Sequence, residues 1–157
     1  MIIAVRFFLI SLCISFFASS SHANILTGPV TNPENGHEYY LLTTNSWTAS
    51  QAEAITLGGN LVTINDALEN NWVYSTFSSF GGGNRALWIG LNDQAQEGTF
   101  VWVSGQTTDY SNWRPGEPSG GEENFVHLCP PDFSPGQWND LINFSTFFFD
   151  VKWCGGS

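Results

Sequence analysis

Positive charge is scarce in this sequence. Four Lys and Arg residues stand against 14 Asp and Glu residues, which gives a formal net charge of −10 at pH 7. Nucleic acids and anionic membrane surfaces are bound through clustered Lys and Arg side chains, so both are excluded as partners. Disordered acidic chains are poor in aromatic residues. Because aromatic residues make up 15% of this chain, it is expected to form a compact domain.

Long apolar runs are also missing, apart from one near the start. Phe7–Ala18 carries no charge, follows Arg6, and is closed by Ser21-His22-Ala23, the pattern of a secretory signal peptide cleaved before Asn24. A membrane anchor is the alternative, but the run is shorter than the roughly 20 residues that span a bilayer. We therefore expect a signal peptide over residues 1–23, a secreted or periplasmic location, and no membrane insertion of the mature chain.

Cysteine is rare as well. Of the 3 cysteines, Cys13 lies inside the expected signal peptide, which leaves Cys129 and Cys154. Two cysteines in an exported chain usually pair, so the sequence predicts a disulfide between them. Two buried thiols are the alternative, which the spacing leaves open.

The rest of the chain has helical patterns first and strand patterns afterwards. Residues 24–33, rich in Pro, Gly, Thr and Asn, are expected to be a leader with little structure. Helices are predicted over 47–57, after Ser46 as N-cap, and from Asn65 or Asp66 to about Phe77. The expected strands are 37–43, 61–64, 87–91, 99–103, 125–128 and 147–153. Two early helices and several late strands predict one α+β domain over residues 34–157.

Oxygen-bearing side chains gather in one irregular stretch, Trp113–Asp140. It begins in a loop, residues 105–121, whose length in a compact domain is typical of functional or disordered segments. The loop contains Tyr and Trp, which favours order. Its oxygen donors then follow at three points: Glu117 with Ser119, Glu123 with Asn124, and Asn139 with Asp140. Calcium takes about six to eight oxygen ligands of these kinds, so the stretch predicts a calcium site on an exposed loop.

Several short motifs occur in the order of a known family. They are Trp47-Thr48-Ala49, Gly58 through Ile64, Glu69-Asn70, Trp88-Ile89-Gly90-Leu91 and Trp138-Asn139-Asp140. In this order and spacing the sequence resembles the C-type lectin-like domain, and the resemblance extends from about Glu34 to Trp153. It implies an α+β fold with two helices, antiparallel strands and a long structured calcium-binding loop.

The resemblance also implies a set of calcium ligands. The family builds its principal site from a Glu-Pro-Asn or Gln-Pro-Asp triplet with a cis peptide bond before its proline, a later Glu, and an Asn-Asp pair. The matching residues here are Glu117, Ser119, Glu123, Asn139 and Asp140. The same residues would bind carbohydrate, since two adjacent sugar hydroxyls complete the coordination of Ca²⁺. Glu117 points to mannose-type sugars, whereas Ser119, in place of Asn or Asp, is expected to weaken calcium binding.

A second calcium site occurs in some members of the family. Asp93, Glu97, Glu123 and Asn124 fall at the corresponding positions, and a solvated acidic turn is the alternative. Other residues occupy the positions of the family's own disulfides, so a Cys129–Cys154 bridge would be a substitute for them.

Two functions of different classes fit these observations. The first is calcium-dependent carbohydrate binding, and the second is a protein-binding or ice-binding adhesin in which calcium is only structural or absent. Catalysis is not expected, because a glycosidase needs a cleft that raises the pKa of one of its two carboxyl groups, whereas Gly-rich loops expose Glu117 and Glu123. His127 is expected to be structural, and Trp113 to anchor the loop rather than to stack on a sugar.

Overall fold

The computed structural model describes residues 25–144 and 148–154, with side chains as far as residue 144. The predicted signal peptide and Cys13 lie outside the described residues, as does Phe147, the predicted start of the last strand. Within the described part of the chain, no helix combines the length and the apolar character that crossing a bilayer requires.

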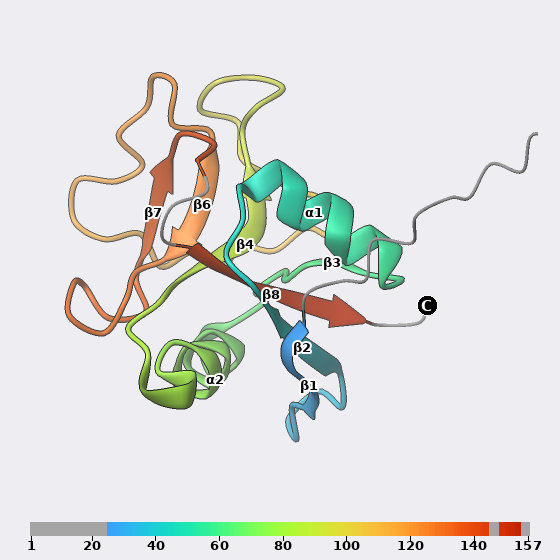
Figure 1. Cartoon of the computed structure of the whole chain (residues 1–157). Coiled ribbons are helices and arrows are strands. Elements are labelled where there is room, and N and C mark those ends of the chain that lie inside the picture. The colour runs from blue at the N-terminus through green and yellow to red at the C-terminus, as the bar shows by residue number, and fades with distance from the viewer. Residues whose placement is uncertain (1–24, 145–147, 155–157) are drawn as a thin grey trace, which may run out of the picture.

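One eight-stranded sheet forms the body of the molecule, with strand order β1-β2-β8-β4-β6-β7 (Figure 1). These strands are β1 (Ile25–Thr31), β2 (Glu38–Leu42), β4 (Ala86–Asn92), β6 (Phe125–Leu128), β7 (Trp138–Leu141) and β8 (Phe148–Cys154). The short β3 (Asn60–Leu61) pairs with β8, and β5 (Val101–Trp102) pairs with β4. Every pairing is antiparallel except that of β4 with β8.

Two α-helices flank this sheet, as the sequence predicts. In α1 (Trp47–Thr56) the Ser46 side chain accepts a hydrogen bond from the Ala49 N–H, and in α2 (Ala67–Phe77) the Asp66 side chain accepts one from the Glu69 N–H. Figure 1 shows α1 and α2 on opposite sides of β8. A short 3₁₀ turn, η1 (Phe80–Gly82), follows α2. The expected α+β class is confirmed.

The hydrophobic core lies on both faces of β4, all of whose residues are buried. One cluster contains Tyr39, Val73, Ile89 and Trp138 among others, and a second contains Trp47, Trp88 and Phe125. The Trp47 Nε1–H also donates a hydrogen bond to the Ile89 carbonyl at 2.7 Å, which joins α1 to β4. The continuous apolar run of this strand is thus explained by burial on both sides.

The prediction that residues 24–33 have little structure is wrong, because residues 25–31 form β1. This strand pairs with β2, with register shifts on either side of Thr27. It is an edge strand, where a residue without an N–H, such as Pro29, is tolerated. The turn-forming composition of this segment therefore reflects an irregular edge strand rather than an unstructured leader.

The predicted Cys129–Cys154 disulfide is also corrected, because Cys129 is a free, buried cysteine. The strand register gives the reason. Leu87 of β4 pairs with Leu128 on one side and with Phe149 on the other, so β4 separates Cys129, which follows Leu128, from the beginning of β8. Cys154 lies five residues further along, roughly 16 Å at the rise of a strand, and a disulfide requires Cα atoms within about 7 Å.

Candidate functional site

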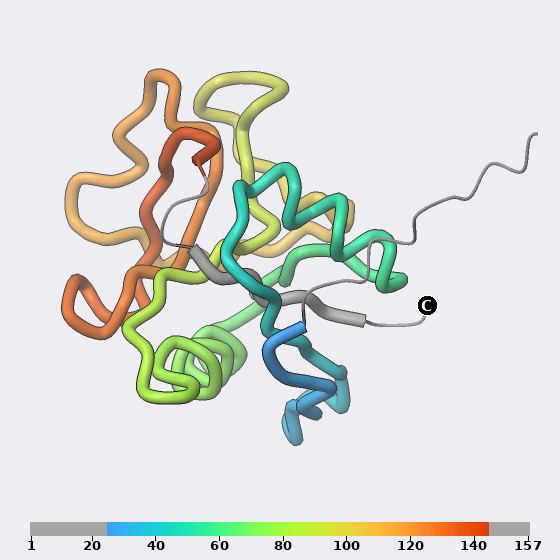
Figure 2. The backbone as a smooth tube through the Cα atoms, viewed as in Figure 1, coloured from blue at the N-terminus to red at the C-terminus, as the bar shows by residue number. Residues whose placement is uncertain are grey.

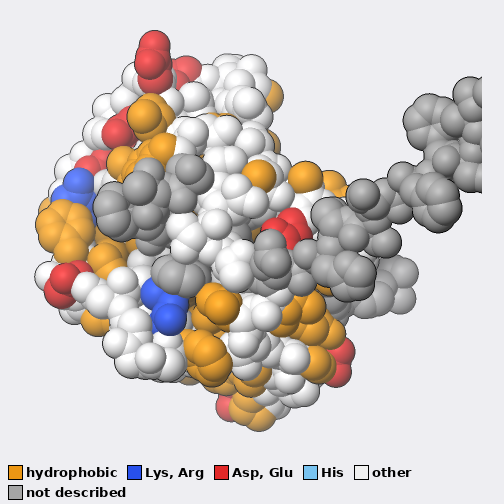
Figure 3. Space-filling model, viewed as in Figure 1, with side chains coloured by type: hydrophobic (Ala, Val, Ile, Leu, Met, Phe, Trp, Pro, Cys, Tyr) orange, Lys and Arg blue, Asp and Glu red, His pale blue; other side chains and the backbone are white. Residues whose placement is uncertain are grey.

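The candidate calcium ligands come from two segments that the fold brings together. Glu117, Ser119 and Glu123 lie on the loop before β6, and Asn139 and Asp140 lie on β7. This loop projects from one end of the molecule (Figure 2). On the face drawn in Figure 3, acidic side chains gather at the same end. The peptide bond between Glu117 and Pro118 is cis, as the resemblance implies.

Trp138 anchors the two segments to the core. Its side chain is fully buried, and the rings of Trp102, Tyr110 and Trp113 each meet it edge to face at centroid distances of 5.6 to 5.8 Å. The Trp138 Nε1–H donates to Asn70 Oδ1 on α2. Trp113 is therefore an anchor of the loop, as expected. Asn139 and Asp140 follow Trp138 directly, so this packing also fixes their position.

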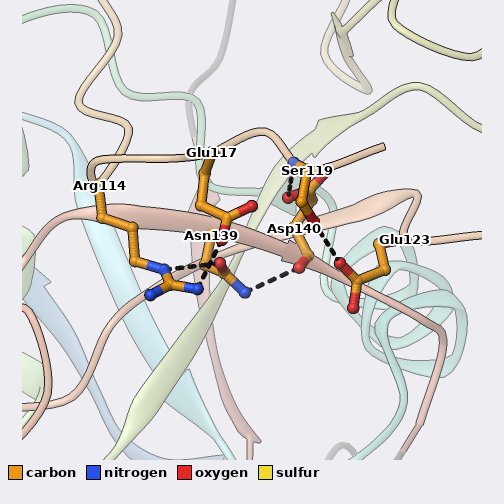
Figure 4. Close-up of polar contacts among 6 residues, drawn as sticks. All are labelled: Arg114, Glu117, Ser119, Glu123, Asn139 and Asp140. Carbon is orange, nitrogen blue, oxygen red and sulfur yellow. Dashed lines mark hydrogen bonds and ion pairs between the residues drawn. The ribbon is translucent and has the colours of Figure 1, made fainter. Parts of the chain in front are cut away.

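Hydrogen bonds connect four of the candidate ligands directly, and Glu117 joins them through Arg114 (Figure 4). The Ser119 N–H donates to Asp140 Oδ1 at 3.3 Å, and the Ser119 hydroxyl bonds to Glu123 Oε2 at 2.7 Å. The Asn139 Nδ2–H donates to the Asp140 carbonyl at 2.8 Å. In Figure 4, Asp140 lies between Glu117 and Glu123. The predicted residues thus form one neighbourhood.

Arg114 is a member of this site that the sequence analysis did not assign to it. Its guanidinium forms an ion pair with Glu117 Oε1 at 2.5 Å and donates to Asn139 Oδ1 at 2.8 Å. The guanidinium carbon also lies 5.0 Å from the centre of the Phe133 ring. One sequence signal was available, namely that Arg114 precedes Glu117 by three residues across a tight Pro-Gly turn. Phe133, in the loop between β6 and β7, gave no signal.

Two carboxylates keep an oxygen that is buried and has no hydrogen-bond partner. These atoms are Glu117 Oε2 and Asp140 Oδ2. Burial raises the pKa of the Asp140 carboxyl, the Ser119 N–H lowers it, and the neighbouring Glu117 raises it again. Buried carboxylate oxygens without partners are costly. A cation bound between Glu117 and Asp140 would remove that cost.

The carboxylates nevertheless do not converge on one centre. Among the described residues, no three His, Cys, Asp and Glu side chains are arranged to hold a metal ion. Glu123 is turned to the Ser119 hydroxyl, and Glu117 to Arg114. Carboxylate, amide and hydroxyl oxygens are the types of ligand that calcium takes. Two of them, Glu117 Oε2 and Asp140 Oδ2, have no hydrogen-bond partner that a calcium ion would have to displace. Glu117, Glu123 and Asn139 would have to exchange their present partners to complete a calcium site.

The residues of the predicted second site also lie on neighbouring loops. The Asp93 N–H donates to the Asn124 carbonyl at 3.2 Å, and the Gly121 N–H donates to Glu97 Oε1 at 2.8 Å. Asp93 Oδ2 accepts from the Gly98 N–H, while Asp93 Oδ1 is buried without a partner. These contacts brace two loops. Calcium binding by Asp93, Glu97, Glu123 and Asn124 stays a prediction.

The surroundings of His127 fit the structural role expected for it. The ring is buried beside Trp88, and its Nδ1–H donates to the Leu128 carbonyl at 3.0 Å. Burial lowers the pKa of His127 to about 4. The imidazole is therefore neutral at physiological pH.

Of the candidate ligands, Ser119 is exposed, Glu117 and Glu123 are half-buried, and Asn139 and Asp140 are buried. A cavity of about 410 Å³ opens elsewhere beside the loop, lined by residues that include Leu91, Phe100, Trp102, Tyr110 and Trp113. The five candidate ligands do not line it. A loop site of this kind suits recognition of groups presented from outside more than the enclosure of a substrate.

Comparison with known proteins agrees with the class that the fold and the loop define, a C-type lectin fold. Residues 43–144 match the Lectin C-type domain family. The chain is 36% identical over 109 residues to Lectin BRA-3 of Megabalanus rosa, which covers 68% of this chain and 64% of that protein. It is 31% identical over 96 residues to the galactose-specific lectin nattectin of Thalassophryne nattereri, which covers 61% and 60%.

Solved structures give the same result. The carbohydrate-recognition domain of cow CD23, determined in the presence of a GlcNAc2Man3 oligosaccharide, superposes with a TM-score of 0.63 at 30% identity, covering 77% of this chain and 89% of that one. This chain belongs to the C-type lectin domain family. It spans about 60% of the length of the first relatives that it matches. The family consists of binding domains, which agrees with the expectation that this domain is not an enzyme.

Proposed function

We propose that this domain binds carbohydrate through a calcium ion held by Glu117, Ser119, Glu123, Asn139 and Asp140. The observation that supports it most directly is the pair of buried, unpartnered oxygens on Glu117 and Asp140. Neighbouring carboxylates repel each other, and a divalent cation shared between their two free oxygens would remove that repulsion. Relatives named as lectins, one of them galactose-specific, support the same class of ligand.

The protein residues have separate tasks in this proposal. Calcium supplies a divalent charge and free coordination positions, which two neighbouring sugar hydroxyls can fill. Glu117 and Glu123 accept hydrogen bonds from those hydroxyls, and the Asn139 side-chain amide donates one. Ser119 contributes only a short hydroxyl, so it offers a weaker ligand than the amide it replaces. Trp138, one residue before Asn139, keeps the β7 ligands in place.

The sugar class is proposed to be mannose-type, because Glu117 begins the triplet. Nattectin is named as galactose-specific, so mannose and galactose should be compared directly. We also propose export of the chain, which rests on the apolar run after Arg6. The domain then begins with β1, at about Ile25, rather than after a leader.

Binding measurements with and without chelator test the proposal. Isothermal titration with calcium, followed by mannose and galactose, should give calcium binding first and sugar binding only in its presence. Asp140→Asn should weaken calcium binding more than about 100-fold, since it removes one charged ligand. Asp109→Asn, an exposed acid of the same loop outside the candidate set, should leave it unchanged. Glycan binding that is unaffected by chelator would reject coordination of the sugar by calcium.

A further inference from the structure

We infer that Arg114 is a built-in cation of this site and sets its calcium affinity. The inference rests on the proposed function. In the described structure the guanidinium forms an ion pair with Glu117 Oε1 and donates a hydrogen bond to Asn139 Oδ1. Both are candidate calcium-ligand residues. Glu117 and Asn139 must therefore leave Arg114 before they can turn to a divalent ion.

The fold holds Arg114 in this position. The Arg114 N–H donates to the Trp138 carbonyl at 3.0 Å, and the Glu117 N–H donates to the Arg114 carbonyl at 3.1 Å. At the end of the Arg114 side chain, the guanidinium carbon lies 5.0 Å from the centre of the Phe133 ring. Phe133 itself is 53% exposed. Backbone bonds and an aromatic ring thus direct the guanidinium to the ligand oxygens.

The charges explain why the contact forms. Side-chain exposure is 27% for Arg114 and 7% for Glu117, so the pair is shielded from water. Glu117 and Asp140 are also neighbours in the site (Figure 4). A guanidinium beside Glu117 offsets the repulsion between these two acids. It is well suited to this task, because its planar fork can bond two oxygen acceptors at once.

Arg114 is therefore expected to stabilise the calcium-free site and to weaken calcium binding. Without calcium, Arg114 stabilises the loop, because it neutralises a buried carboxylate. With calcium, it competes for Glu117 and Asn139 and adds a positive charge beside a divalent ion. A purely structural ion pair would contribute to stability in the same way but would leave calcium affinity unchanged or improve it by ordering the loop.

The test compares Arg114→Met with Arg85→Met by calcium titration and by thermal unfolding in chelator. Arg114→Met should lower the melting temperature in chelator and tighten the calcium Kd about tenfold, equivalent to ~1.4 kcal/mol. Arg85, whose guanidinium donates to the Phe80 carbonyl in η1, controls for the loss of one positive charge. Its substitution should change the calcium Kd less than about twofold.

Two further variants keep the test decisive if Arg114→Met does not fold. Arg114→Lys keeps the charge without the planar fork, and Phe133→Ala removes the ring that positions the guanidinium. Each should tighten calcium binding by a smaller factor, about two- to threefold. Equal or weaker calcium binding by folded Arg114 variants overturns this inference alone. Absence of calcium binding in both the original protein and every Arg114 variant overturns the proposed function as well.

Discussion

The Trp138 Nε1–H donates to Asn70 Oδ1 at 2.8 Å, although 68 positions separate the two residues in the chain. The same Asn70 side chain donates through Nδ2 to the Gly136 carbonyl at 3.1 Å. Asn70 lies on α2 and is 1% exposed. One buried amide therefore ties the helix to the start of β7, the strand that carries Asn139 and Asp140.

Asn70→Ala is expected to destabilise the domain by about 1–3 kcal/mol, because it leaves the buried Trp138 indole N–H without its partner. The Gly136 carbonyl loses one of its two donors and keeps Asn112 Nδ2. Urea unfolding measures this change. Asn71→Ala, which replaces the exposed neighbour on the same helix, should change stability by less than about 0.5 kcal/mol. Similar losses for the two variants would refute the assigned role.

Ser119→Asn is expected to tighten calcium binding about tenfold, because an amide carbonyl can reach an ion that a hydroxyl does not. Calcium titration of the two proteins measures the difference. Ser111→Asn places the same side chain on an exposed position of the same loop and should have no effect. An unchanged calcium Kd for Ser119→Asn would show that position 119 is not a ligand.

Calcium removal is expected to lower thermal stability. At a free calcium concentration 100 times the Kd, binding stabilises the folded state by about 2.7 kcal/mol, which for a domain of this size is roughly 5–10 °C. Scanning calorimetry in calcium and in chelator measures the shift. Glu123→Gln should reduce it, whereas magnesium, which prefers rigid octahedral sites, should not reproduce it. A calcium shift of the same size in Glu123→Gln would exclude that residue as a ligand.

Stability in chelator is expected to fall with pH through His127. The folded-state pKa of His127 is about 4, against 6.5 in the unfolded chain, because the ring is buried; Arg114 lowers the pKa further, while Glu117 and the Leu128 carbonyl raise it. Between these two pH values only the unfolded chain takes up the proton. The contribution is therefore complete above pH 6.5 and is lost as the pH falls to 4, about 3 kcal/mol in all.

Comparison with His127→Gln isolates this contribution, since the carboxylates titrate in both proteins. The difference in unfolding free energy between the two should decrease as the pH falls from 6.5 to 4. A difference that stays constant over this range would show that His127 is protonated equally in the folded and unfolded states.

The elements with strong local signals were predictable from sequence. Ser46 and Asp66 cap their helices because a short polar side chain before an apolar periodic run satisfies free N–H groups. Residues 87–91 were identified as a strand buried on both faces because the run is continuously apolar. The candidate ligands were predicted to share a neighbourhood. Hydrogen bonds connect Ser119, Glu123, Asn139 and Asp140, and Arg114 connects Glu117 to Asn139.

The features that depended on tertiary pairing were not predictable. β1 forms because β2 offers it an edge, although its own sequence favours turns. The disulfide prediction used the count and likely export of the cysteines, whereas the strand register separates Cys129 from Cys154. Arg114 entered the site through contacts with Asn139 and Phe133, which are 25 and 19 positions away, and no local pattern specifies such contacts.

The last strand fills the gap between β2 and β4, which do not pair with each other in the described sheet. In chain order, β4, β6 and β7 are all synthesised before β8, the strand that joins them to β2. The N-terminal strands join this half only when residues 148–154 have been synthesised. The sheet therefore cannot be closed between β2 and β4 before β8, the last of its described strands in the chain, has been made.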